Sequence, residues 1–315
     1  MSTTCLMAAI VAVWLLLWDD EFQRFAATVR IGSGKVYGPL QVFWLDGAPA
    51  VGFPVATLEE ARAGGDLLIT EREQATVPEL VVENRGKGHV LLLAGEILLG
   101  GKQNRVLTED LLLPPRSGPR PIGVYCVEQG RWVERSAGFE ARGSFAAPGL
   151  RAKVLEKEGQ GRVWAEVDRY ARSAAAPSPT GSYQAIYDKP EVKAHLSEAE
   201  QALDHRAAPG ALGAATFVAG ALVGVDLFGD PTLFARQWPK LLRAQAVEAY
   251  RRPSEPPADA AKLRARVERL LRMAGVVEGT LRTNAGVGHL FECRLEAHRG
   301  AALLFDGRVI HAAIL

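Results

Sequence analysis

The sequence predicts an α+β fold with a β-rich N-terminal half, a helical middle, and C-terminal helices plus antiparallel strands packed on the same body. Residues 32–145 contain short runs rich in Val, Ile and Leu, separated by Gly, Pro or charged turns. From Leu150 the apolar residues recur at helical spacing, and strand-like runs return after residue 276. Hydrophobic residues make up 48% and charged residues 23% of the chain, which is typical of globular domains.

The N-terminal half is predicted to open with an amphipathic helix from Asp20 to Ile31, because Phe22, Phe25 and Val29 share one face. A second helix is expected from Thr57 to Ala63. The remaining apolar runs are too short for helices and are bounded by turn residues. We therefore predict strands at residues 40–45, 66–70, 78–83, 89–94, 104–113 and 121–127.

The middle of the chain is predicted to be helical at residues 160–174, 182–188 and 191–206. In the first of these, Val163, Val167 and Tyr170 form one apolar stripe. The intervening AAAPSPTGS has the composition of a surface loop and is the best candidate for an internal linker. We expect one domain over residues 21–315, divided into two packed halves at about residue 150.

The C-terminal part begins with AATFVAGALVGVDLFGDP, which predicts two strands ending at Asp230, the N-cap of a helix with Pro231 at its first position. Because Pro239 removes a backbone donor, a kink or restart is expected near Trp238. Asp259 is expected to cap another helix. Strands follow at residues 277–282, 288–297 and 301–315, the last folded as a hairpin at residues 306–307.

The N-terminal extension, residues 1–20, has no charged side chain before Asp19 and contains the apolar run LMAAIVAVWLLLW. Three interpretations stay open: a signal or membrane anchor, a buried helix, and a misassigned start codon. Only this segment suggests a membrane. For the domain itself a cytoplasmic location is favoured, since three cysteines without paired spacing are too few for a disulfide framework.

Charge patterning does not favour a nucleic-acid partner. The chain has 37 Lys and Arg against 36 Asp and Glu, so no global field would gather nucleic acid. Residues 240–272 are locally basic and could contact phosphates. Most of these charges fall opposite the apolar stripes, however, where a solvated helix face is expected.

The first motif that carries chemistry is LLLAGEILLGGKQNR, in which a buried-strand pattern runs into a Gly pair and then polar residues. It differs from a phosphate-binding P-loop because Gln103 replaces the hydroxyl residue that binds magnesium. Glu96, Lys102, Gln103 and Arg105 are predicted to line a polar site. The alternative is a glycine-enabled bulge or hairpin with solvated charges.

The second motif is YCVEQGRW. Glu128, Gln129, Arg131 and Trp132 suit a planar, phosphorylated ligand, since arginine grips phosphate and tryptophan stacks on rings. The alternative is an Arg131–Glu128 ion pair beside a Trp132 that only packs. If the two motifs converge, the carboxylates of Glu96 and Glu128 are candidates for the catalytic acid and base.

Metal and cofactor signals are weak. His289 and Cys293 share a strand face, and His311 lies on the last strand, but no third ligand has a recognisable spacing. The sequence also lacks HExxH, GxSxG and dinucleotide-binding motifs. We therefore predict no metal site and identify no cofactor.

Several runs together resemble the ARPP family, which is named for its association with ADP-ribosylglycohydrolase and rhodanese-phosphatase proteins. They are LLLAGEILLGGKQNRVLTEDLLLPP, VYCVEQGRW, QGRVWAEV, GALVGVDLFGDPTLF and the final GRVIHAAIL. The resemblance covers about residues 21–315. It implies a link to ADP-ribose, nucleotide or phosphate-ester metabolism, but no catalytic residue can be carried over.

Two functions remain open at this point. In the first, the protein binds a phosphorylated ribose or a nucleotide-like molecule. One form of this hypothesis is that the protein also hydrolyses that molecule. Lys102, Arg105 and Arg131 would then neutralise phosphate, and Trp132 would stack on the ligand. In the second, it is a non-catalytic partner or regulator of a neighbouring phosphatase or glycohydrolase.

Overall fold

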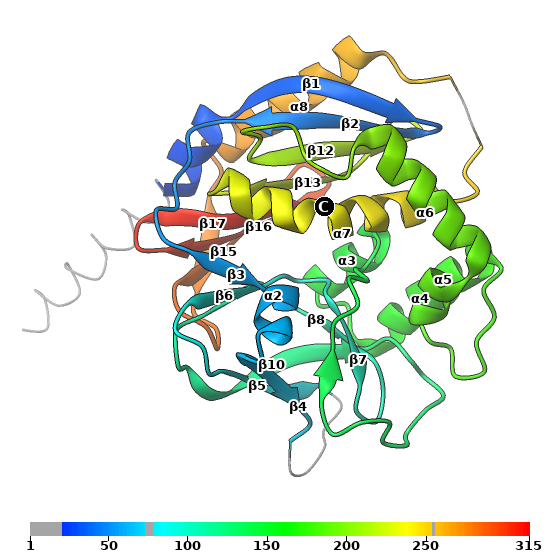
Figure 1. The fold of residues 1–315 in the computed structure, drawn as a ribbon. Helices are drawn as coiled ribbons and strands as arrows, with labels where there is room; N and C mark the ends of the chain where they lie inside the picture. The colour runs from blue at the N-terminus through cyan, green and yellow to red at the C-terminus, as the bar shows by residue number, and fades with distance from the viewer. Residues whose placement is uncertain (1–20, 73–77, 254–255) are drawn as a thin grey trace, which may run out of the picture.

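The computed structural model describes residues 21–72, 78–253 and 256–315, and it confirms the α+β class with antiparallel sheets (Figure 1). In this part of the chain the strands form three sheets. The predicted N-terminal extension lies outside the described residues, which begin in a helical segment at residues 21–28.

The largest sheet has eight strands in the order β1-β2-β12-β13-β17-β16-β15-β14, and all neighbours are antiparallel. It joins the first two strands of the described chain to the C-terminal ones. The strands are β1 (Arg30–Tyr37), β2 (Leu40–Asp46), β12 (Gly213–Val218), β13 (Ala221–Phe228), β14 (Gly279–Arg282), β15 (His289–Leu295), β16 (His298–Phe305) and β17 (Arg308–Ile314).

Helices cover both faces of this sheet (Figure 1). On one face lie α8 (Ala260–Ala274) and residues 21–28, and on the other lies α7 (Pro231–Ala249). Leu263, Val267 and Leu270 of α8 are buried against the sheet. Each fully buried aliphatic side chain of this kind contributes about 1.5–3 kcal/mol, so the apolar stripe of α8 fixes its position.

The β-rich lobe contains the other two sheets. The six-stranded sheet has the order β11-β7-β8-β10-β5-β4, and the three-stranded sheet has the order β3-β6-β9. The helix α2 (Leu58–Ala63) begins with a capping box between Thr57 and Glu60. The strands are β3 (Val55–Thr57), β4 (Leu67–Thr70), β5 (Glu79–Asn84), β6 (His89–Leu92), β7 (Ile97–Gly100), β8 (Arg105–Leu107), β9 (Leu111–Leu113), β10 (Gly118–Cys126) and β11 (Phe139–Glu140).

The helical middle comprises α3 (Pro148–Leu155), α4 (Gln160–Ala174), α5 (Gln184–Asp188) and α6 (Pro190–Leu203). Helix α4 has the predicted bounds, and its stripe residues Val163, Val167 and Tyr170 are buried. The predicted linker AAAPSPTGS connects α4 to α5 within this compact region.

Three local predictions were wrong in whole or in part. The opening helix ends at residue 28, because residues 30–37 pair with β2 as an edge strand. The single strand expected at residues 104–113 is two strands, β8 and β9, divided by a turn in which the Asp110 side chain accepts a hydrogen bond from the Ala94 amide (2.8 Å). The restart expected near Trp238 is absent from helix α7, while the kink that was its alternative stays a prediction. The helix continues through Pro239 to Ala249, with most of its surface buried.

A buried network of charges joins the eight-stranded sheet to the β-rich lobe. His311 on β17 contacts Asp110 through Nδ1 (2.6 Å) and Asp226 through Nε2 (3.1 Å), and Arg151 of α3 contacts Asp226 (2.6 Å). Burial alone would lower the pKa of His311, but the two aspartates outweigh it and raise the pKa. For Asp226 the effects are reversed: burial would raise the pKa of this carboxyl, but Arg151 and His311 outweigh it and lower the pKa.

The largest buried cluster draws residues from both sides of residue 150, and β1 and β2 belong to the sheet that the C-terminal strands complete. The division into two halves stays a prediction. Among the described residues, no helix combines the length and the apolar character needed to cross a bilayer.

Candidate functional site

The two sequence motifs meet at one end of the β-rich lobe. The first motif supplies β7, the turn after it and the start of β8, while the second supplies the end of β10 and the residues that follow. Strands β8 and β10 are paired, with Arg105 opposite Cys126, so the turn after β7 lies beside the segment after β10.

Close backbone approach at this turn requires glycine. Gly100 and Gly101 have φ angles of +142° and +49°, a region that other residues rarely adopt. A Cβ atom on Gly100 would lie 2.4 Å from the Gly138 carbonyl oxygen, and one on Gly101 would lie 2.4 Å from the Phe139 ring. The Gly pair therefore brings the turn against the 131–139 loop.

A third segment completes the site. It is the loop before α5, which the sequence had suggested only as a linker. Residues 128 and 182 form an isolated antiparallel bridge, and the Gly130 amide donates to the Thr180 carbonyl (2.8 Å). The Asn104 side chain donates to the Ser182 hydroxyl (3.0 Å), which ties this loop to the first motif.

These three segments enclose a pocket of about 400 Å³, hereafter the polar pocket. Its wall carries four hydroxyls, two amide side chains, three carboxylates and two guanidinium groups. The lining residues are Leu99, Gly100, Asn104, Glu128, Arg135, Ser136, Glu140, Arg142, Ser178, Thr180, Ser182, Gln184, Ala185 and Asp188.

Glu128 is the predicted site residue that lines the polar pocket. Its Oε2 accepts hydrogen bonds from the Asn104 amide (3.1 Å) and Arg131 (2.7 Å), and its Oε1 accepts from the Thr180 hydroxyl (2.7 Å). Burial would raise the pKa of Glu128, but these hydrogen bonds outweigh it and lower the pKa. Glu128 therefore carries a negative charge near neutral pH and accepts these three hydrogen bonds, and its catalytic role stays a prediction.

Arg131 lies just beneath the pocket and holds its parts together. Its guanidinium donates to the carbonyls of Gly101 (2.6 Å), Val133 (2.9 Å) and Gly100 (3.2 Å), and to the side chains of Asn104 (3.3 Å) and Glu128 (2.7 Å). The Arg131–Glu128 pair that we weighed as an alternative interpretation is thus present. The donors on its two terminal nitrogens are directed at the protein itself.

Two polar residues of the first motif are likewise engaged with the protein, one of them through the backbone of Gln129 in the second motif. The fully buried Arg105 donates to the Gln103 carbonyl (2.9 Å) and lies 3.6 Å from Glu71. Gln103 donates to the carbonyl of Gln129 (3.1 Å). None of Gln103, Arg105 and Gln129 is among the residues that line the polar pocket. Their predicted ligand-binding roles stay predictions.

Lys102 and Trp132 lie on the outer side of the same turn and loop. The ammonium of Lys102 lies 5.4 Å from the centre of the Trp132 ring, within the range of a cation–π contact. Trp132 is 48% exposed, and the adjacent Val133 is 73% exposed. Neither Lys102 nor Trp132 lines the polar pocket, but both lie on segments that form it.

Glu96 lies in a different environment. Buried at the start of β7, it pairs with Lys240 of α7, whose ammonium also contacts both oxygens of Glu59 (3.0 and 3.1 Å). Burial raises the pKa of Glu96 to about 7, against the opposing effect of Lys240. Burial disfavours the charged form of Lys240, but the two glutamates outweigh it and raise its pKa. Glu96 does not line the polar pocket, and its catalytic role stays a prediction.

Sequence reasoning missed most of the pocket wall. Arg135 and Arg142 are exposed residues after the second motif, and Ser178, Thr180 and Asp188 follow a helix far along the chain. The SPTGS run was an available signal, since binding residues often lie on surface loops. Within the described residues, no group of three or more His, Cys, Asp or Glu is arranged to hold a metal ion.

Comparison with known proteins gives one match. The model of the ARPP-1 domain, described as the ARG and Rhodanese-Phosphatase-superfamily-associated Protein domain, matches residues 28–315. No curated protein and no solved structure matches the chain. Because the match spans nearly the whole chain and includes all three segments of the polar pocket, the protein belongs to the ARPP-1 family.

Proposed function

We propose that the polar pocket binds a phosphorylated ribose or a nucleotide-like molecule. The observation that carries this proposal is the convergence of three distant segments on one polar cavity of about 400 Å³, a size within the usual range of small-molecule sites. The family's association with two superfamilies of enzymes is consistent with such a ligand, although it does not specify one.

Two exposed arginines provide the anion-binding part. Arg135 and Arg142 line the pocket, and the Arg142 guanidinium lies 3.4 Å from the Glu140 carboxylate, its one partner among the described residues. The backbone amide of Arg135 donates to the Gly101 carbonyl (2.9 Å), so the chain at Arg135 is fixed to the turn of the first motif. A guanidinium binds phosphate oxygens through two parallel hydrogen bonds. These arginines suit that role better than Arg105 and Arg131, neither of which lines the polar pocket.

The hydroxyl-rich part of the wall suits a sugar. Ribose hydroxyls both donate and accept hydrogen bonds, so they need partners of both kinds. The carboxylates of Glu128 and Asp188 accept, while the Ser178 hydroxyl and the Gln184 amide can donate. In this proposal Glu128 anchors a ligand hydroxyl or accepts a proton, because it is held in its ionised form. Trp132, beside the pocket, offers a face on which a base can stack.

Titration calorimetry with ribose 5-phosphate, AMP and ADP-ribose tests the proposal. Wild-type protein should bind at least one of them. Arg135→Ala and Arg142→Ala should each weaken binding about tenfold or more, since a hydrogen bond to a charged group is worth roughly 1.5–3 kcal/mol. Arg85→Ala is the matched control, because Arg85 is exposed and lies outside the pocket. Chromatography of the mixture after incubation shows whether the ligand is also hydrolysed.

The proposal fails if none of the three ligands binds, or if the control variant loses as much affinity as the pocket variants. Unfolding temperatures of all variants separate loss of binding from loss of fold. Because every substituted arginine is exposed, we expect the fold to be retained.

A second function is favoured by one specific observation. Trp132 and Val133 expose apolar surface side by side on the pocket loop, and exposed tryptophan is enriched at the energetic centre of protein interfaces. The protein would then be a non-catalytic partner of a phosphatase or glycohydrolase encoded nearby. Size-exclusion chromatography with such an enzyme, using wild type and Trp132→Ala, distinguishes this function. Co-elution that the variant abolishes would support it.

A further inference from the structure

The lining of the polar pocket is divided into a buried part and an exposed part. Its buried polar residues are Asn104, Glu128 and Ser182, which are 2%, 3% and 9% exposed and are hereafter called the floor. Its exposed residues, hereafter the rim, are Arg135, Ser136, Glu140, Arg142 and Asp188. A ligand in this pocket therefore has one end on the floor and the other at the rim.

The hydrogen bonds of Glu128 leave one acceptor position on the floor open. Its two carboxylate oxygens together offer about four such positions. Oε2 accepts from the Asn104 amide (3.1 Å) and from Arg131 (2.7 Å), and Oε1 accepts from the Thr180 hydroxyl (2.7 Å). The second position on Oε1 has no donor among the described residues. A ligand atom that contacts Oε1 there must therefore donate a hydrogen.

Two serine hydroxyls beside Glu128 can donate to the same ligand. Ser182 Oγ accepts from the Asn104 side chain (3.0 Å), and Ser178 Oγ accepts from the amides of Ser182 (3.0 Å) and Thr180 (3.4 Å). In the part of the chain that the structure describes, only a long contact of 3.4 Å, from Ser178 Oγ to Thr180 Oγ1, competes for either serine proton. Both serines line the pocket. The buried end of the pocket thus offers one acceptor and two donors.

This pattern suits ligand hydroxyls and not a phosphate. A hydroxyl donates one hydrogen bond and accepts others, whereas an ionised phosphate has only acceptor oxygens and leaves the open position on Glu128 unsatisfied. The positive charge of Arg131 does not change this, because its terminal nitrogens donate to the protein and the residue does not line the pocket. A phosphate on the same ligand therefore belongs at the rim.

The rim offers the phosphate one arginine that is not already paired. Arg142 lies 3.4 Å from Glu140, and Asp188 accepts a hydrogen bond from Gln184 (3.2 Å). The Arg135 side chain forms no ion pair with any residue that the structure describes, and its backbone is fixed to the Gly101 carbonyl. Arg135 is thus the rim residue best suited to bind a phosphate.

Building on the proposed function, we infer that the polar pocket selects a 5-phosphorylated ribose with free 2- and 3-hydroxyls, which lie on the floor while the phosphate lies at the rim. In D-ribofuranose these two hydroxyls are on the opposite face of the ring from the 5-phosphate, so one ring satisfies both parts of the lining. The selected class includes 5′-nucleotides. It excludes deoxyribose compounds and ribose that is phosphorylated at position 2 or 3.

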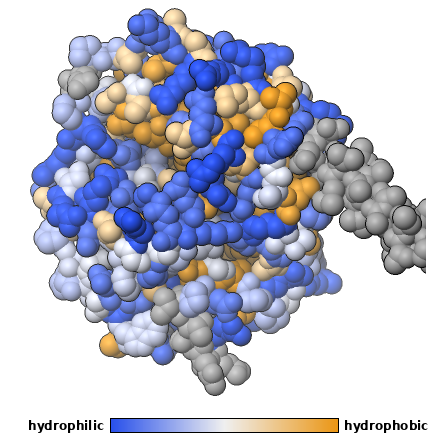
Figure 2. Space-filling view, turned by 180° about the vertical axis from the view of Figure 1, so that it is seen from behind, coloured by the Kyte–Doolittle hydropathy of each residue, from blue (hydrophilic) through white to orange (hydrophobic). Residues whose placement is uncertain are grey.

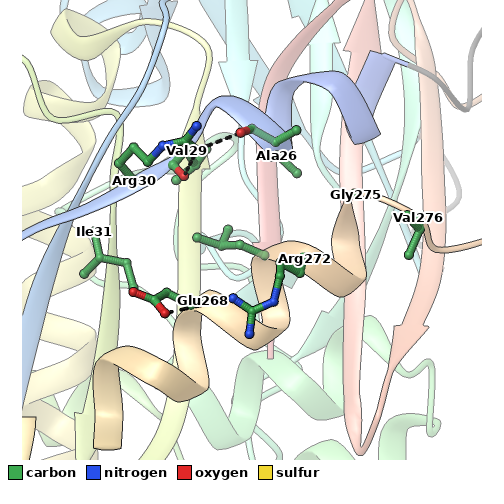
Figure 3. Close-up of a pocket in the computed structure, with 10 residues that line it drawn as sticks. Ala26, Val29, Arg30, Ile31, Glu268, Arg272, Gly275 and Val276 are labelled. Atoms are coloured by element: carbon green, nitrogen blue, oxygen red, sulfur yellow. Dashed lines mark hydrogen bonds and ion pairs between the residues drawn. The ribbon is translucent and has the colours of Figure 1, made fainter. Parts of the chain in front are cut away.

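A second pocket lacks the groups that this selection requires. It has a volume of about 440 Å³ and lies between α8 and residues 26–31 (Figure 3). The described residues that line it include arginines and a glutamate but no hydroxyl or amide side chain. Hydrophobic and hydrophilic surface lie side by side on the upper part of the molecule seen from behind (Figure 2). Arg272, which Figure 3 shows beside this pocket, is therefore a matched control for Arg135.

Titration calorimetry with wild-type protein and ligand analogues tests the inference. The ligands are AMP, 2′-deoxy-AMP, 3′-AMP, ribose 5-phosphate and 2-deoxyribose 5-phosphate. Each deoxy compound should bind about fivefold or more weakly than its parent, because a buried partner loses its hydrogen bond. AMP should bind more tightly than 3′-AMP. Arg135→Ala should weaken AMP and 2′-deoxy-AMP by the same factor, and Arg272→Ala should change neither.

The variant Glu128→Gln tests the orientation by the sign of its effect. The Asn104 amide and Arg131 both donate to Oε2, so the carbonyl oxygen of the glutamine takes that position and its NH₂ group replaces Oε1. The floor then presents a donor in place of an acceptor. AMP should bind about fivefold or more weakly, and the preference for AMP over 3′-AMP should narrow. Unfolding temperatures show whether the variant is folded, and the wild-type comparisons do not depend on it.

Three results would overturn the inference and leave the polar pocket a ligand site. They are equal affinity for AMP and 3′-AMP, equal affinity for a deoxy compound and its parent, and tighter binding of AMP by Glu128→Gln, which would place the phosphate on the floor. Binding of ADP-ribose without binding of AMP or ribose 5-phosphate would also overturn it. If none of these three ligands binds, the proposed function fails together with the inference.

Discussion

Replacing Lys240 by methionine should be among the most destabilising single changes in this protein. Lys240 is 4% exposed and neutralises Glu96, which is 1% exposed, while also binding both oxygens of Glu59. Removing one partner of a buried ion pair leaves the other charge buried without compensation and typically costs about 3–5 kcal/mol. Methionine fills a similar volume, so the expected loss is electrostatic and not a cavity effect.

The loss of stability caused by Lys240→Met should depend on pH. Burial raises the pKa of Glu96 to about 7, above the value of 4.5 that applies to the unfolded chain. A raised carboxyl pKa lowers stability progressively from pH 4.5 up to the folded pKa, because only the unfolded chain has released its proton there. Without Lys240 the folded pKa rises further, so this window extends upward. The destabilisation by Lys240→Met should therefore be larger at pH 8 than at pH 5.

Urea unfolding at pH 5 and pH 8, followed by tryptophan fluorescence, measures the loss of stability caused by Lys240→Met and its dependence on pH. The double variant Lys240→Met, Glu96→Gln should regain about half or more of the loss at pH 8, because the uncompensated charge is gone. Lys193→Met, at an exposed position on α6, should change stability by no more than about 0.5 kcal/mol. A loss below about 1 kcal/mol at pH 8, or no recovery in the double variant, would refute the reasoning.

Three further predictions concern other parts of the chain. Asp110 and Asp226 raise the pKa of His311, so the stability that this histidine confers is complete below pH 6.5 and declines as the pH rises through the folded pKa. The variant His311→Gln should lack this decline. Urea titrations from pH 6 to 9 measure it, and equal pH dependence of stability in wild type and variant would contradict the prediction. Gly101→Ala should lower Tm by several degrees, as the new Cβ would meet the Phe139 ring at 2.4 Å and φ is +49°, whereas Gly52→Ala, with open space around it, should leave Tm almost unchanged. Trp132→Ala should change the free energy of unfolding by no more than about 0.5 kcal/mol. It should weaken the binding of ADP-ribose by about 1–3 kcal/mol without affecting the binding of ribose 5-phosphate. Equal effects on the binding of both ligands in calorimetry would argue against stacking.

Much of the fold could be predicted where one face of an element is apolar and the other is not. Helix α4 has its predicted bounds for this reason, whereas the β16–β17 hairpin falls near its predicted bounds because Asp306 and Gly307 mark its turn. Helix α3 was missed because it is buried on several sides, so its apolar residues show no stripe. Strand β1 was missed because Gly32 and Gly34 interrupt any alternation. A Cβ on Gly34 would lie 2.8 Å from the Phe43 ring, so its contact with β2 requires glycine.

The candidate site was predictable only where its contacts are local. The Arg131–Glu128 pair spans three residues and was foreseen as an alternative. Lys240 pairs with Glu96 across 144 positions, and Thr180 reaches Glu128 across 52. Contacts of this kind depend on how the sheets pack, which local periodicity does not encode. The pocket arginines were missed because exposed charges in a loop have no distinguishing pattern.

A crystal structure of the protein with ADP-ribose would show whether the polar pocket is a ligand site. We predict ligand density between the turn at Gly100, the Glu128 carboxylate and the loop at Thr180, with a phosphate within hydrogen-bonding distance of Arg135 or Arg142. A fully occupied ligand elsewhere on the molecule, or an empty pocket at saturating ligand, would contradict the claim.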